Sequence, residues 1–151
     1  MTELNFKLEV VDGWPPIGFE SVPCSLIEGG FRIESPPLFV KGLSCGDLIT
    51  AQLDADGIVQ SWGFLKQSNR TTIWLLRTLG PYDLRPALRC LRGLGCHTVQ
   101  LENLGCYSVD VPGECAFEKV DECLANIDNS FIAIAYPSFR HPEPESPGNG
   151  V

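Results

Sequence analysis

The second half of the chain switches regularly between the two hydrophobic periodicities of strands and helices. Three runs place apolar residues at strand-like alternation and two carry a helical stripe, with one further strand that is apolar on both faces. A strand that is apolar on both faces is covered on both faces. In chain order these runs are residues 71–78 (strand), 84–94 (helix), 96–101 (strand), 106–111 (strand), 116–127 (helix) and 131–136 (strand). This order predicts a ferredoxin-like βαββαβ sandwich.

The first half shows no helical stripe. Phe6, Leu8 and Val10 alternate with charged residues, and later apolar runs are paired across the turns Glu28-Gly29-Gly30 and Asp54-Ala55-Asp56-Gly57. Five or so short strands in under seventy residues predict a small SH3-like β-barrel. The predicted fold class is therefore α+β, with a barrel in residues 1–68, a sandwich in residues 69–140 and a disordered tail in residues 141–151.

The sandwich has one sheet face that its two helices do not cover. We expect Thr98, Gln100, Ser108 and Asp110 to form the polar half of that open face. An uncovered face with an apolar half requires an occupant, which is the barrel, a ligand or a partner.

Charge is distributed unevenly along the 151 residues, whose net charge is −8. Residues 1–68 carry −5, residues 69–140 carry −1 and the tail carries −2. Acidic proteins bind nucleic acid poorly, because neutralisation of phosphate drives that affinity. A basic partner is favoured instead. The longest apolar runs are too short for a membrane helix, and the first residues do not resemble a signal peptide, so we expect a cytoplasmic protein with no membrane partner.

The residues that usually carry chemistry do not form a recognisable set. The seven cysteines include no pair at zinc-binding spacing, and the odd count predicts seven reduced thiols without metal. His97 and Cys96 are neighbours on a strand and so face opposite ways. The Asp54–Gly57 turn resembles the start of a calcium loop, but Leu65 stands where the bidentate glutamate is required, which favours a plain hairpin turn. We expect no enzyme activity and no cofactor.

Two stretches carry a resemblance to a known family. Residues 6–21 (FKLEVVDGWPPIGFES) and residues 39–47 (FVKGLSCGD), followed by an acidic hairpin and by Asn69-Arg70-Thr71-Thr72, resemble a bacterial family of small two-part proteins catalogued as a domain of unknown function. The resemblance covers roughly residues 5–136. Some members of such families lie beside toxins as immunity proteins, and the resemblance implies that role for this chain.

The leading hypothesis is accordingly a non-enzymatic protein-binding module, an immunity protein that neutralises a basic toxin domain. Its expected partner-binding residues lie in turns of the acidic half, where carboxylates stay exposed and an aromatic side chain can anchor a partner. These residues are Asp12, Trp14, Asp47, Asp54 and Asp56. Trp62 is a second aromatic candidate if exposed. The alternative is a small-molecule-binding regulatory domain that uses the open sheet face or the interdomain cleft. RNA binding is a third hypothesis, on fold analogy alone.

Overall fold

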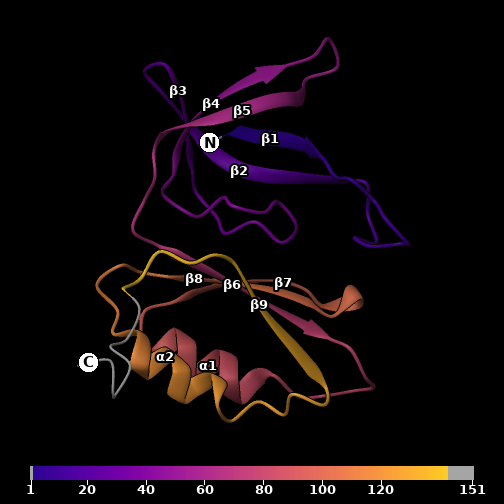
Figure 1. The fold of residues 1–151 in the computed structure, drawn as a ribbon, viewed down its shortest axis with the longest axis vertical. Helices are drawn as coiled ribbons and strands as arrows, with labels where there is room; N and C mark the ends of the chain where they lie inside the picture. Colours follow the sequence, from indigo (N-terminus) through magenta and orange to yellow (C-terminus); the bar gives the residue numbers. More distant parts are fainter. Residues whose placement is uncertain (1, 143–151) are drawn as a thin grey trace, which may run out of the picture.

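The computed structural model describes residues 2–142, which form three layers: a barrel, a sheet and a pair of helices (Figure 1). The sheet lies between the barrel and the helices. The protein is of the α+β class with two separate sheets.

The barrel is a closed sheet of five strands in the order β1-β2-β3-β4-β5. Its strands are β1 (Thr2–Lys7), β2 (Phe19–Ile27), β3 (Gly30–Ile33), β4 (Leu48–Leu53) and β5 (Ile58–Lys66). Short parallel pairing of β1 with β5 closes the barrel. Alternate residues of each strand point inward, so the core is built from side chains such as Leu4, Val22, Ile33 and Ile49. No helix occurs within residues 2–66.

The second sheet has four strands in the order β7-β8-β6-β9. They are β6 (Thr71–Arg77), β7 (His97–Leu101), β8 (Cys106–Val111) and β9 (Ile132–Ser138), and all of their pairings are antiparallel. Helices α1 (Arg85–Gly93) and α2 (Phe117–Leu124) cover one face, and the short 3-10 helix η1 (Glu102–Leu104) joins β7 to β8. Ile73, Val109, Leu91 and Val120 meet between the sheet and the helices, where each is fully buried.

The orientation predicted for β7 is wrong. Thr98 pairs with Val109, and residues paired across antiparallel strands share a face. Because Val109 faces the helices, Thr98 and Gln100 also lie on the helix side, where the Arg92 side chain donates to the Thr98 hydroxyl at 2.8 Å. β7 is an edge strand, so α1 covers its helix-side residues only in part, and polar side chains are tolerated there. Ser108 and Asp110 do lie on the other face, as predicted.

The face opposite the helices is covered by the segment that connects β3 to β4. The Pro37 carbonyl accepts hydrogen bonds from the Trp74 indole and the Ser108 hydroxyl, both at 2.8 Å. Ser44 places its hydroxyl 2.8 Å from that of Thr72 and donates to that of Ser138 at 2.9 Å. The occupant of the open face is therefore the barrel half of the same chain.

A buried ion pair connects this segment to the end of the chain. Asp47 is fully buried, and its carboxylate accepts two hydrogen bonds from the Arg140 guanidinium, at 2.6 and 2.9 Å. The backbone N–H groups of Ser44 and Ser68 donate to the same carboxylate at 2.7 and 2.8 Å. The prediction that Asp47 is an exposed turn carboxylate is therefore wrong. A second pair, Arg70 with Asp110, lies nearby.

His141, the first residue of the predicted disordered tail, is buried in the structure. Its Nδ1 lies 2.6 Å from the Thr71 hydroxyl and its Nε2 lies 2.8 Å from the Pro112 carbonyl. Because a carbonyl only accepts, Nε2 is the donor to Pro112. His141 thus belongs to the sheet layer. The rest of that tail, residues 143–151, lies outside the described residues.

The expectation of seven free thiols is not met by the structure. Cys90 of α1 and Cys123 of α2 form a disulfide, and the other five cysteines are free. The two helices lie side by side on the sheet, which brings together residues 33 positions apart. Sequence spacing alone does not reveal such a pair, because only the packing of α1 on α2 sets the distance.

We expect Asp47→Asn to lower the free energy of unfolding by about 3–5 kcal/mol, because it leaves the Arg140 guanidinium buried without its counter-charge. Urea denaturation measures the change. Asp56→Asn is the matched control at an exposed turn position and should stay within about 0.5 kcal/mol of the parent. Equal effects of the two variants would contradict the structural role of Asp47.

Thiol counting tests the disulfide. The protein denatured without reductant should react at five thiols, and after reduction at all seven. The intact mass should rise by about 2 Da on reduction, for the two hydrogens gained. Cys90→Ser should remove the mass change, whereas Cys24→Ser should leave it in place. Seven reactive thiols before reduction would instead support the original sequence-based expectation.

Candidate functional site

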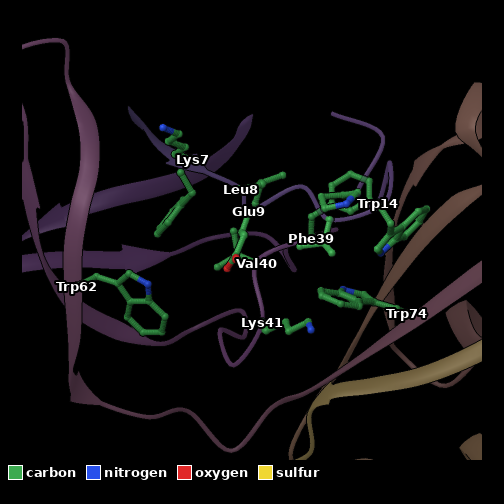
Figure 2. Close-up of a pocket in the computed structure, with 12 residues that line it drawn as sticks. Lys7, Leu8, Glu9, Trp14, Phe39, Val40, Lys41, Trp62 and Trp74 are labelled. Atoms are coloured by element: carbon green, nitrogen blue, oxygen red, sulfur yellow. The ribbon is translucent and has the colours of Figure 1, made fainter. Parts of the chain in front are cut away.

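A cavity of about 530 Å³ opens where the barrel meets the four-stranded sheet. Its walls come from β1 and the segment after it, from the β3–β4 connection, from β5 and from β6 (Figure 2). The lining residues are Phe6, Lys7, Leu8, Glu9, Val11, Trp14, Pro15, Phe39, Val40, Lys41, Trp62 and Trp74. This volume falls within the usual range for ligand pockets, about 300–1,000 Å³.

All three tryptophans of the chain line this cavity. Trp62 comes from β5 of the barrel, Trp74 from β6 of the sheet, and Trp14 from the β1–β2 connection. Trp62 and Trp74 are partly buried, and Trp14 is 46% exposed. Tryptophan is the largest side chain and is frequent at binding surfaces, so the concentration of all three here makes this cavity the candidate site.

Trp14 is positioned by a tight turn. Val11 and Trp14 exchange two backbone hydrogen bonds, at 2.9 and 3.0 Å. Between them, Asp12 and Gly13 both have positive φ, at 54° and 77°. Asp-Gly is a favoured pair for a turn that needs two left-handed residues. The turn directs Trp14 to the cavity rim, where its ring meets that of Phe39 edge to face with centroids 5.9 Å apart.

Phe39 and Val40 are held in place by a buried carboxylate. Glu20 of β2 accepts hydrogen bonds from the backbone N–H groups of Leu38, Phe39 and Val40, at 2.6, 2.8 and 3.1 Å. Burial raises the pKa of the Glu20 carboxyl, and the three N–H donors act in the opposite direction. One side chain thus fixes three consecutive residues of the segment that forms the cavity wall.

Three charged side chains lie around the cavity. Figure 2 shows the Glu9 carboxylate directed toward the centre, beside Val40, while the Lys7 ammonium points away. Lys41 extends toward Trp74. The lining therefore combines aromatic faces with one inward carboxylate, an arrangement suited to binding.

The acidic residues predicted to bind a partner lie in different environments. Asp12 is exposed at the tip of its turn, and Asp56 is exposed at the β4–β5 turn. Asp54 is half-buried, and its Oδ1 accepts the N–H groups of Asp56 and Ile58, so it builds the predicted hairpin turn. Asp54 also lines a second cavity of about 430 Å³ together with Lys7 and Glu9. Of the predicted five, only Trp14 lines the tryptophan cavity, and Asp47 lies in the buried interface.

Sequence reasoning missed Glu9, Phe39 and Trp74 as site residues. The sequence left open whether Trp74 and Leu76 or Ile73 and Leu75 face away from the helices. The structure directs Trp74 to that side, where its indole donates to the Pro37 carbonyl, and buries Ile73 and Leu75 against the helices. The signal available in the sequence was the count of three tryptophans, two of them in the barrel half. Which tryptophans line the same cavity depends on how the barrel packs on the sheet, and the hydrophobic periodicity of the sequence carries no information about that packing.

Two of the free cysteines, Cys45 and Cys96, are poor nucleophiles. Burial raises the pKa of Cys96 to about 12 and that of Cys45 to about 11, so both thiols are protonated near neutral pH. Within residues 2–142, His, Cys, Asp and Glu side chains form no group of three that could hold a metal ion. In the same residues no helix is both long and apolar enough to cross a bilayer.

Comparison with known proteins places the chain in a family. Residues 20–133 match the family described as Domain of unknown function (DUF4265). The chain belongs to this family. The resemblance seen in the sequence is thereby confirmed as a DUF4265 relationship, over well more than half of the chain.

One solved structure shares the fold of this DUF4265 protein. It is described as a novel crystal structure of a hypothetical protein from Neisseria gonorrhoeae, with a TM-score of 0.71 and 16% sequence identity. The match covers 93% of this chain and 97% of that one, so the shared fold extends over the barrel half and the sheet-and-helix half. No curated protein matches the chain.

Glu20→Gln tests how the cavity wall is held. The amide keeps one acceptor oxygen, but its NH₂ group replaces the other and faces a backbone N–H, for example that of Leu38. We therefore expect a loss of about 1–3 kcal/mol in unfolding free energy. Tryptophan emission should also change, because Trp14 packs on Phe39. Glu28→Gln, at the exposed β2–β3 turn, is the matched control and should change neither signal. Unchanged stability and emission in Glu20→Gln would show that the wall is held by other contacts.

Proposed function

We propose that this protein is a non-enzymatic protein-binding module that captures a basic partner at the tryptophan cavity, and that it acts as an immunity protein against a cognate bacterial toxin. The observation that supports this proposal is the meeting of all three tryptophans at one cavity within an acidic chain. Aromatic side chains dominate binding energy at protein interfaces, and net charge of −8 steers a basic partner toward the site.

The acidic turns next to the cavity support a protein as the partner. The Lys7–Glu9 segment lines both cavities, so it connects the wall that carries Trp14 to the wall that carries Asp54. Asp56, in the same turn as Asp54, is exposed. A partner seated over Trp14 and this turn contacts a desolvated aromatic anchor together with acidic residues that speed its approach.

A specific observation also favours a second function, a small-molecule-binding regulatory domain. The cavity lies between barrel and sheet, the position expected for a ligand cleft, and has the volume of one. The two functions differ in what fills the same cavity.

The finer description of the fold is part of the proposal. The order β7-β8-β6-β9, with both helices on one face, supports a ferredoxin-like sandwich. The five-stranded closed sheet supports an SH3-like barrel. We assign residues 1–68 and 69–140 to two domains on that basis. We also propose a cytoplasmic location. The Cys90–Cys123 disulfide counts against it, because disulfides rarely persist in the reducing cytoplasm, so the thiol count described above also tests the location.

Binding kinetics with the partner purified from the native host test the proposal. Asp54→Lys/Asp56→Lys should slow association, most strongly at low salt, because the exposed acidic turn steers the encounter. Trp14→Ala should instead speed dissociation, since it removes a 46% exposed aromatic anchor.

The matched control is Asp121→Lys/Glu122→Lys on α2, which makes the same change of charge on the helix layer away from the barrel. It should leave the dissociation rate unchanged and slow association less. If the α2 variant slows association as much as the turn variant, and Trp14→Ala dissociates like the parent, the proposed site is wrong. A metabolite that binds the purified protein, with no partner protein found, would support the second function.

A further inference from the structure

We propose that the tryptophan cavity is a receptor for a single arginine side chain of the partner, which inserts its guanidinium between the Glu9 carboxylate and the Trp62 indole. This inference rests on the proposed function and specifies the chemistry of its site.

The positions of the charged groups favour a cation on the Trp62 side. The Glu9 carboxylate points to the cavity centre, between Trp62 on one side and Trp74 on the other (Figure 2). The Lys7 ammonium points out of the cavity, and Lys41 extends toward Trp74. The Trp62 side thus has an aromatic face and a carboxylate, and neither lysine extends toward it. Indole faces attract cations, and tryptophan is the strongest of the aromatic residues in this respect.

Arginine fits this arrangement better than lysine. Its planar guanidinium stacks on an aromatic face while its edge donates to a carboxylate, and it is weakly hydrated, so it enters an aromatic cavity at lower cost. The molecule already contains one such contact. The Arg140 guanidinium lies 5.6 Å from the centre of the Phe64 ring while it pairs with Asp47. Phe64 in turn packs edge to face on Trp62, with centroids 5.1 Å apart.

The surroundings are acidic enough to attract a guanidinium. The barrel half carries −5, and the exposed Asp56 lies in the turn beside the second cavity that Glu9 shares. The Arg140 charge near Phe64 is compensated by the buried Asp47 carboxylate. The net charge of the barrel half therefore favours the approach of a cation, although the lining itself holds Lys7 and Lys41 besides Glu9.

Intrinsic fluorescence of the full chain tests the inference directly, because all three tryptophans line this cavity. The probes are the peptide acetyl-Gly-Arg-Gly-amide and the same peptide with citrulline, which has the shape of arginine without its charge. Phenylacetate serves as an anionic aromatic probe. We expect saturable quenching or a spectral shift with the arginine peptide, and at least about tenfold weaker binding of the citrulline peptide.

Two pairs of variants locate the site. Glu9→Gln should weaken arginine-peptide binding about fivefold, as expected for a partly exposed ion pair. The matched control Glu3→Gln, at an exposed glutamate of β1 that lies outside the cavity lining, should not change it. Trp62→Phe should weaken binding about threefold through the poorer cation–π contact. Tyr136→Phe, at an exposed aromatic residue of β9 that does not line the cavity, is the matched control and should leave the affinity as it is. Circular dichroism and thermal melts establish that each variant folds.

Each other outcome overturns the inference. Equal affinity for the arginine and citrulline peptides would show that charge is not recognised. Binding of phenylacetate that is lost in Lys41→Met would show that the cavity selects anions. No response to any probe would show that it holds no independent side-chain receptor. The partner kinetics with Trp14→Ala and the Asp54/Asp56 variant remain a separate measurement. The peptide measurements can therefore rule out the arginine receptor without ruling out the binding function, and the partner kinetics can rule out the binding function without ruling out the arginine receptor.

Discussion

The packing of the barrel against the sheet depends on the burial of Asp47. Its carboxylate receives four hydrogen bonds: two from the Arg140 guanidinium and two from the backbone N–H groups of Ser44 and Ser68. These donors come from the β3–β4 connection, from the chain between the two sheets and from the segment after β9. A buried charge is tolerated only when it is paired and fully hydrogen-bonded, and here the partners are drawn from both halves of the molecule. The barrel and the sheet are consequently fixed to one another.

The cavity follows from that fixation. The β3–β4 connection is held at its far end by Asp47, at its centre by the Glu20 carboxylate, and on the sheet by the Pro37 carbonyl. Phe39 and Val40 thereby form a wall between the barrel, which carries Trp62, and the sheet, which carries Trp74. The site belongs to neither half alone, because each supplies only part of the lining.

Polar contacts hold the barrel against the sheet, and this has a consequence for the proposed site. Within residues 2–142, no buried side-chain nitrogen or oxygen lacks a hydrogen-bond partner. Directional bonds define one relative placement of the layers, whereas an apolar interface tolerates sliding. The recognition site proposed here, assembled across two layers, needs such a placement, since binding is strongest when the contacting groups are already in position.

By itself, the sequence determined the elements and the layers. The alternation of Ile73 and Leu75, the leucine stripe of α1 and the turn at Asp54 each follow from local periodicity or turn chemistry, and all were predictable. The family relationship was also visible in residues 39–47, which lie within the matched region of residues 20–133. Local patterns are sufficient here because the period of apolar residues depends only on backbone geometry. The same reasoning predicted an uncovered sheet face that required an occupant.

Only the tertiary structure decided what covers that face and which residues form the site. Asp47 has the local sequence of an exposed turn residue, and its burial depends on Arg140, which is distant in the chain. The pairing of Cys90 with Cys123 depends on the packing of α1 on α2. Glu9 and Trp74 become neighbours of one cavity only when the barrel rests on the sheet. Such contacts join residues far apart in the sequence, and their distance is set by the docking of whole layers, which no local pattern encodes.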